Sequence, residues 1–78
     1  MRWEIKYNSS DIKVETRFTG ERLFVNGELQ DEQIGAFSIR SRLWGQLPTG
    51  ECIKVSIGGG VFTERCSIFI NHKLIFSK

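Results

Sequence analysis

Two segments of this 78-residue chain follow the same pattern, and that repetition constrains the fold more than any other feature. Residues 18–29 begin with Phe-Thr-Gly-Glu-Arg and reach Asn26-Gly27, and residues 62–74 begin with Phe-Thr-Glu-Arg and reach Asn71-His72. In each copy a leucine, Leu29 or Leu74, follows the turn by two residues. Asn-Gly is the strongest short-range hairpin signal, because both central residues of a type I′ turn need positive φ. The repeat therefore predicts two hairpins of one design within a small all-β domain.

Alternation of apolar and polar residues covers most of the remaining chain. Apolar residues alternate with charged ones in Arg2–Tyr7, and Ile12–Phe18 alternates in the same way after a turn at 8–11. A period of two is typical of strands that are buried on one face only. Weaker alternation over residues 37–44 predicts a further strand, and no segment has the spacing of an amphipathic helix.

These patterns predict one domain over residues 1–78, built from seven to eight short antiparallel strands. Strands of this length and spacing, joined consecutively as a meander, favour a small β-sandwich or a flattened barrel. The positions that alternate inward form the expected core: Trp3, Ile5, Tyr7, Val14, Phe18, Phe24, Leu29, Ile53, Val55, Ile57, Ile68 and Ile70.

The turn at Asn26-Gly27 also predicts the register of its hairpin. A two-residue loop pairs Phe24 with Leu29 on the core face and sets Arg22 opposite Asp31. We expect the second pair to be an exposed ion pair, which contributes about 0–1 kcal/mol.

The hairpin over residues 51–70 allows two registers. If the three glycines at 58–60 alone form the loop, Cys52 directly opposes Cys66. If Val61 joins the loop, Ile57 pairs with Phe62 and Cys52 stays outside the apolar face. We favour the second register and free thiols, because burying Phe62 stabilises by about 1.5–3 kcal/mol, more than an exposed ion pair does.

Composition excludes several classes of protein. Eleven basic and nine acidic residues leave a net charge of +2, which is too small to indicate a polyanion partner by itself. Apolar runs of about four residues are too short to span a membrane, and charges near the N-terminus argue against a signal peptide. One histidine and two cysteines cannot build a typical zinc site or a disulfide scaffold. We expect a cytoplasmic protein without a cofactor.

Two groups of residues are candidates for a binding role. Arg40, Arg42 and Trp44 project from one strand face, where guanidinium groups beside an indole could hold phosphate and stack on a base. Two arginines are a small footprint, so an ordinary solvated strand face is the competing interpretation. The second group lies on the apolar C-terminal hairpin and suggests self-association: Phe69, Leu74 and Phe76.

No catalytic residue is predicted. The glycines at 58–60 precede a strand and not the helix that a phosphate loop needs, and His72 lies at a turn tip without a nucleophile or carboxylate nearby. We therefore expect a non-enzymatic module that binds another protein or associates with itself as a homodimer. The alternative is a weak anionic-ligand or nucleic-acid binder that uses the Arg/Trp face.

The order of these elements resembles a lobe of the Fas apoptotic inhibitory molecule family. Four runs carry the resemblance: Trp3–Tyr7, Arg22–Leu29, Ile53–Ile57 and Ser67–Leu74. Lobes of that family are all-β with paired hairpins, although His72 stands where their turn has Gly, and this chain is one lobe where members may have two. The resemblance implies a non-catalytic β-sandwich that acts through protein contacts and carries over no functional residue. Small bacterial proteins with the same turn pattern fit equally well.

Overall fold

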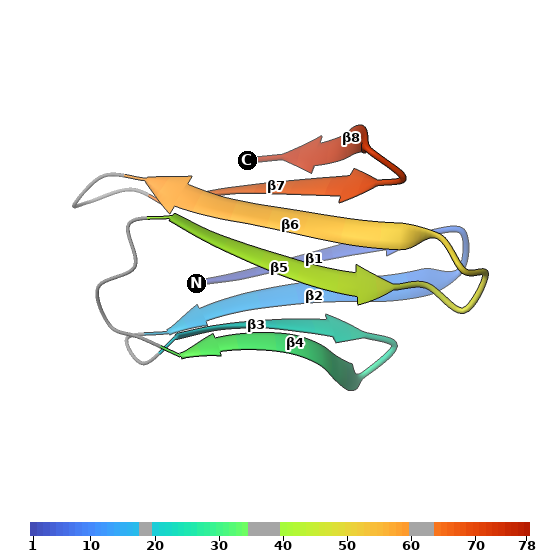
Figure 1. The fold of residues 1–78 in the computed structure, drawn as a ribbon, viewed down its shortest axis with the longest axis horizontal. Helices are drawn as coiled ribbons and strands as arrows, with labels where there is room; N and C mark the ends of the chain where they lie inside the picture. Colours follow the sequence, from blue (N-terminus) through green and yellow to red (C-terminus); the bar gives the residue numbers. More distant parts are fainter. Residues whose placement is uncertain (18–19, 35–39, 60–63) are drawn as a thin grey trace.

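The computed structural model describes residues 1–17, 20–34, 40–59 and 64–78, which form two four-stranded antiparallel sheets and no helix (Figure 1). In each sheet the strands follow one another in chain order. The first sheet consists of β1 (Arg2–Tyr7), β2 (Ser10–Arg17), β3 (Gly20–Val25) and β4 (Glu28–Ile34). The second consists of β5 (Arg40–Gln46), β6 (Cys52–Gly59), β7 (Glu64–Ile70) and β8 (Lys73–Ser77). The prediction of an all-β domain with seven to eight antiparallel strands is confirmed, and the strands number eight among the described residues.

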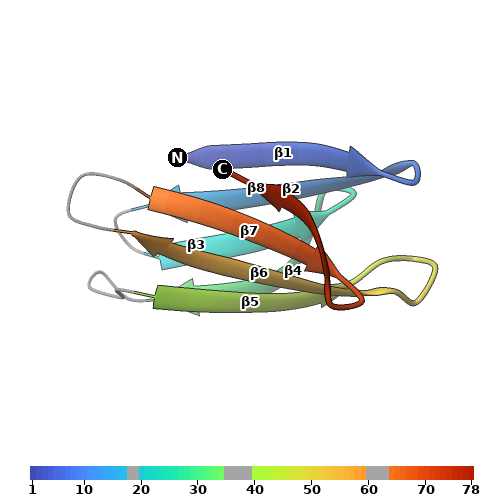
Figure 2. The same ribbon diagram turned by 90° about the horizontal axis from the view of Figure 1, so that it is seen from above.

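The inner faces of the two sheets share one hydrophobic core, and in Figure 2 the strands β5–β8 are seen over those of the first sheet. The period-two alternation places Ile12 and Val14 inward from β2 and Ile53 and Val55 inward from β6, all fully buried. The buried apolar residues among those described are Trp3, Ile12, Val14, Leu23, Val25, Leu43, Leu47, Ile53, Val55, Ile57, Cys66, Ile68 and Ile70. All of them lie in strands except Leu47, which directly follows β5. Ile5 and Tyr7 pack against this core while partly exposed, and Phe18 lies outside the described residues.

The hairpin of β3 and β4 differs from its predicted register beyond the second pair. Phe24 faces Leu29 as predicted, but the register then shifts, so that Leu23 faces Asp31 and Arg22 faces Glu32. The prediction that Phe24 and Leu29 enter the core is wrong: Leu29 is 52% exposed, and Leu23 is buried instead. β3 alternates regularly with Leu23 and Val25 inward, so Phe24 and its partner Leu29 share the outer face. The register shift beyond this pair comes from a bulge, in which Gln30 is an extra residue of β4.

The same hairpin geometry recurs in β7 and β8. Phe69 faces Leu74, and the register shifts immediately afterwards, between Ile68 and Phe69, as it does between Leu23 and Phe24. The turn residues Asn71 and His72 both have positive φ, like Asn26 and Gly27 in the first sheet. The repeated sequence therefore produces repeated structure, down to the position of the bulge.

The hairpin of β6 and β7 takes neither of the two predicted registers. Ile57 faces Cys66 and Ile53 faces Ile70, because Gly58 and Gly59 extend β6 and pair with the start of β7. The connection falls at residues 60–63, which lie outside the described residues. Free thiols are confirmed, with Cys66 buried and Cys52 exposed.

At one edge the two sheets are joined by side chains of β4. The backbone N–H of Trp44 donates to Asp31 Oδ2 at 2.8 Å, and that of Gln46 donates to Gln30 Oε1 at 3.3 Å. Gly45 allows this close approach, because a Cβ there would lie 2.9 Å from Leu23 Cδ2. The outer edge of β5 is thus covered along this stretch, and the position of Trp44 is fixed.

Candidate binding face

The outer face of the second sheet carries a row of side chains that runs across all four strands. Trp44 on β5 faces Lys54 on β6, Lys54 faces Phe69 on β7, and Phe69 faces Leu74 on β8. We call Trp44, Lys54, Phe69 and Leu74 the aromatic row. Trp44 is 54% exposed and Leu74 51%, while Lys54 and Phe69 are half-buried.

Lys54 occupies the centre of the aromatic row. Its ammonium nitrogen lies 4.7 Å from the centre of the Phe69 ring and 5.9 Å from that of Trp44. Aromatic ring faces attract cations at these distances. The role of Lys54 was missed by the sequence reasoning, because it depends on a cross-strand register that was predicted wrongly.

A second row lies beside the aromatic row on the same face. Arg42 faces Ser56, Ser56 faces Ser67, and Ser67 faces Ser77; we call these four residues the serine row. Arg42 is exposed and forms no ion pair with any residue that the structure describes. Two residues of the predicted site, Arg42 and Trp44, thus lie on one outer face, since Leu43 between them is buried. The side chain of Arg40 lies outside the described part of the chain.

The first sheet has two corresponding rows, but their charges are different. One row consists of four charged residues that face one another in the order Arg2, Glu15, Arg22 and Glu32. The second sheet has Arg42 and three serines at the corresponding positions. The other row, Glu4, Lys13, Phe24 and Leu29, has Glu4 in the place of Trp44. Lys13 lies over the Phe24 ring at 4.6 Å, as Lys54 lies over Phe69. The first sheet is therefore a natural control for the second.

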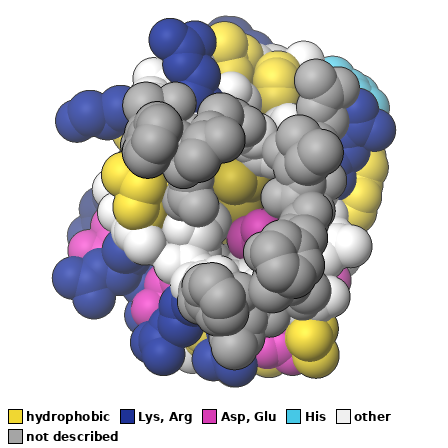
Figure 3. Space-filling view, turned by 90° about the vertical axis from the view of Figure 1, so that its left-hand side faces the viewer, with side chains coloured by type: hydrophobic (Ala, Val, Ile, Leu, Met, Phe, Trp, Pro, Cys, Tyr) yellow, Lys and Arg dark blue, Asp and Glu magenta, His cyan; other side chains and the backbone are white. Residues whose placement is uncertain are grey.

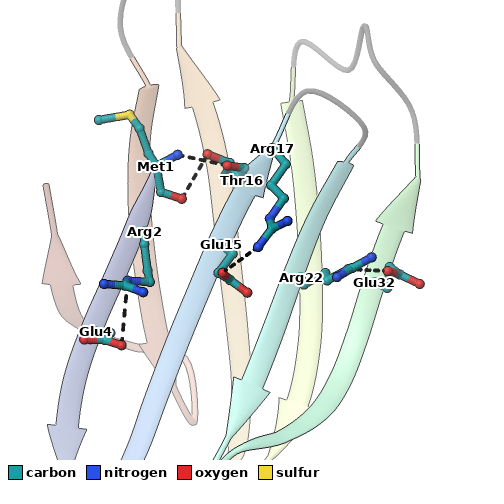
Figure 4. Close-up of polar contacts among 8 residues, drawn as sticks. All are labelled: Met1, Arg2, Glu4, Glu15, Thr16, Arg17, Arg22 and Glu32. Carbon is teal, nitrogen blue, oxygen red and sulfur yellow. Dashed lines mark hydrogen bonds and ion pairs between the residues drawn. The ribbon is translucent and has the colours of Figure 1, made fainter.

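All four ion pairs among the described residues lie in the first sheet. They join Arg22 to Glu32, Arg17 to Glu15 at 3.6 Å, Arg2 to Glu4 at 3.8 Å and Lys6 to Asp11 at 3.9 Å. Figure 4 shows the first three on β1–β4, beside the N-terminus, which donates to the carbonyl of Thr16 at 2.9 Å. The outer face of the first sheet therefore pairs eight of its charged side chains with one another, although Lys13 is in none of these pairs.

Charge is also divided unevenly between the two halves of the sequence. Residues 1–39 contain five Lys or Arg and seven Asp or Glu, whereas residues 40–78 contain six and two. In Figure 3 the coloured side chains of the upper half, where β6–β8 lie, are hydrophobic, Lys, Arg or His, and acidic side chains lie lower. The net charge of +2 conceals a basic second half and an acidic first half.

The three residues predicted for self-association do not share one surface. Phe69 and Leu74 lie on the outer face, but Phe76 packs against the core together with Ile75. The bulge explains this, because an extra residue in β8 turns two consecutive side chains toward the core. The exposed apolar surface of the C-terminal hairpin is smaller than the sequence pattern predicts.

The remaining reactive groups are dispersed. Burial raises the pKa of the Cys66 thiol to about 12. His72 is exposed at its turn, and the described residues contain no cluster of three His, Cys, Asp or Glu that could hold a metal. Tyr7 donates to Glu51 Oε2 at 3.3 Å, and burial and this carboxylate raise its pKa.

Comparison with models of known protein families finds no match, and neither does comparison with curated proteins or with solved structures. In the part of the chain that the structure describes, no helix has the length and apolar character needed to cross a membrane.

Proposed function

We propose that this protein is a non-catalytic binding module of β-sandwich architecture whose partner docks on the outer face of β5–β8. The observation that carries the proposal is the asymmetry between two outer faces of similar register. The four ion pairs among the described residues all lie in the first sheet, where Lys13 faces Glu4, whereas the second sheet leaves Arg42 and Lys54 beside exposed Trp44 and Leu74. Aromatic and arginine side chains are enriched in interfaces, and exposed apolar groups that lie together favour an interaction surface.

The first candidate partner is a protein, including a second copy of this chain. Leu74 and Phe69 support it, because they place an exposed apolar surface at β8, an edge strand of the sheet. Phe76 packs against the core and is therefore not part of the proposed interface. A β-sandwich that acts through protein contacts also agrees with the resemblance to the Fas apoptotic inhibitory molecule family, which stays a prediction.

The second candidate partner is an anionic ligand. It is favoured by the serine row, where Arg42 faces Ser56 while its counterpart Arg2 faces Glu15. An arginine without a neighbouring carboxylate keeps its hydrogen-bond donors available to an external anion.

Sedimentation velocity over a wide range of protein concentration, with reductant present, tests the first candidate. Leu74→Ser and Leu29→Ser form a matched pair, because both leucines are about half exposed and both face a phenylalanine. We expect the wild-type protein to associate at high concentration, Leu74→Ser to remain monomeric, and Leu29→Ser to behave as the wild type.

Two results would contradict self-association through this face. A wild-type monomer at every concentration excludes a second copy of this chain as the partner and leaves a different protein or the anionic ligand. Equal loss of association in both leucine variants would show that the second sheet has no special role.

A further inference from the structure

We propose that the outer face of the second sheet binds single-stranded nucleic acid, with a base stacked on Trp44 and phosphates held by Arg42 and Lys54. The inference rests on the proposed function and names the ligand of its second candidate. It begins with Trp44, whose side chain is 54% exposed while its backbone N–H is held by Asp31 at 2.8 Å. A ring that is fixed at its backbone and open on the surface suits stacking, which works with every base because each has a π-face.

The cations stand at positions that a nucleotide on Trp44 would reach. Arg42 lies two residues away on the same face of β5, about 7 Å along the strand, and Lys54 lies on the next strand, about 5 Å across. A base on the indole therefore has one cation along the strand and another beside it. Arginine and lysine are the usual side chains that contact phosphate.

Phe69 acts as a positioning residue for Lys54. Its ring holds the ammonium group at 4.7 Å, between itself and Trp44, where the nitrogen is 5.9 Å from the indole centre. The amine is thereby kept next to the stacking ring without a carboxylate to neutralise it, among the residues described. The same contact between Lys13 and Phe24 lies next to Glu4, where an anion would be repelled.

The serine row extends the anion-binding character of the face. Ser56 and Ser67 continue across the sheet from Arg42, and hydroxyl groups donate hydrogen bonds to phosphate oxygens. The corresponding positions of the first sheet hold Glu15 and Arg22, followed by Glu32. Only the second sheet offers donors without carboxylates among them.

A single strand fits these observations better than a duplex or an acidic protein. In a duplex the faces of the bases are covered by their neighbours, so an exposed indole has nothing to stack on. An acidic protein segment would use Arg42 and Lys54 but has no need of a fixed, open aromatic ring. A single strand with unstacked bases can stack a base on the ring while its phosphates contact the cations and hydroxyl groups.

Fluorescence anisotropy with a labelled oligothymidylate of about 12 nucleotides tests the proposal. Trp44→Leu keeps an apolar side chain but removes the π-face, and we expect about 5- to 150-fold weaker binding, whereas Trp44→Phe retains most of the affinity. Arg42→Ala and Lys54→Ala should each reduce the slope of log affinity against log salt by about 0.7. Their counterparts Arg2→Ala and Lys13→Ala should change neither affinity nor slope.

The alternative outcomes are distinct. Equal binding of a duplex, with no effect of Trp44→Leu, would overturn the proposal in favour of non-specific attraction. Binding of polyglutamate but not of the oligonucleotide at about 50 mM salt would overturn the nucleic acid and keep the anionic-ligand candidate. If neither probe binds, both the nucleic-acid proposal and the anionic-ligand candidate are overturned, while sedimentation of the leucine variants decides self-association separately. Urea denaturation of each variant confirms that a lost signal is not lost folding.

Discussion

The ammonium group of Lys54 lies over the Phe69 ring at 4.7 Å, and this contact is repeated in the first sheet by Lys13 over Phe24 at 4.6 Å. In both sheets the lysine is directly opposite the phenylalanine, which in turn faces a leucine. The two halves of the chain thus build the same unit, and what differs is its neighbour: Trp44 in one sheet and Glu4 in the other. Function is expected where the repeated halves diverge.

The Lys54–Phe69 contact should contribute measurably to stability. A double-mutant cycle with Lys54→Gln and Phe69→Leu is expected to show a coupling of about 0.5–1 kcal/mol, since the pair is half-exposed. The equivalent cycle with Lys13→Gln and Phe24→Leu should give a similar value. Urea denaturation measures both, and strictly additive effects in each cycle would show that the contacts contribute nothing.

Gly45, the glycine of edge strand β5, should tolerate alanine poorly. The Cβ of Gly45→Ala would lie 2.9 Å from Leu23 Cδ2 and 3.3 Å from Gln30 Cβ, so we expect a loss of about 1–3 kcal/mol in the free energy of unfolding. Gly58→Ala is the matched control, because nothing lies within 4 Å of its added Cβ. Equal urea midpoints for the two variants would contradict the close approach of β4 to β5.

The sequence alone was sufficient to predict where most strands lie and which face of each strand is buried. Ile12 and Val14, like Ile53 and Val55, follow a strict period of two and are buried as expected. Alternation is reliable there because each strand is regular from end to end. The wrong face of β3 was chosen: Leu23 and Val25 point inward at a regular spacing of two, so Phe24 between them points outward. Ile57 is buried as predicted, but its predicted cross-strand partner was wrong because Gly58 continues the strand.

The candidate site was predicted only in part for the same reason. Arg42 and Trp44 lie on one strand, so their shared face follows from spacing alone. To predict that Lys54 lies between two rings, the registers of β5–β6 and of β6–β7 must both be known. Cross-strand neighbours depend on loop geometry, and the loop of β6 and β7 was predicted at the wrong residues.

The two turn asparagines should have two separable roles. Asn26 Oδ1 accepts from the backbone N–H of Asp11 at 2.8 Å, and Asn71 Oδ1 accepts from that of Cys52 at 3.0 Å. Both asparagines also have positive φ. Asn71→Ala loses the acceptor and strains the backbone, at a cost of about 1–3 kcal/mol, whereas Asn71→Gly loses only the acceptor, at about 0.5–1.5 kcal/mol. Chemical denaturation of both series should rank Gly above Ala at each turn; the reverse order would rule out the backbone contribution.

The two thiols should differ sharply in reactivity. Cys52 is exposed, while Cys66 is fully buried opposite Ile57. The thiolate is the reactive species, and burial disfavours it. A chromogenic disulfide reagent should label one thiol per chain at neutral pH, and Cys52→Ser should abolish this labelling. Labelling of both thiols in the folded wild type would show that the second sheet opens readily.

Alkaline pH should destabilise the fold through Cys66. Its pKa is about 12 in the folded state against an ordinary value of 9.0, because burial disfavours the thiolate. Between these pH values the unfolded chain releases a proton that the folded chain keeps, so the free energy of unfolding falls as the pH rises. The stabilisation is fully present below about pH 9 and is lost towards pH 12.

Tyr7, whose pKa is raised by burial and by Glu51, adds a change of the same sign. Urea midpoints measured against pH should decline less steeply in Cys66→Ala than in the wild type, and Tyr7→Phe corrects for the tyrosine; identical slopes in the wild type and Cys66→Ala would mean that the thiol is accessible to water.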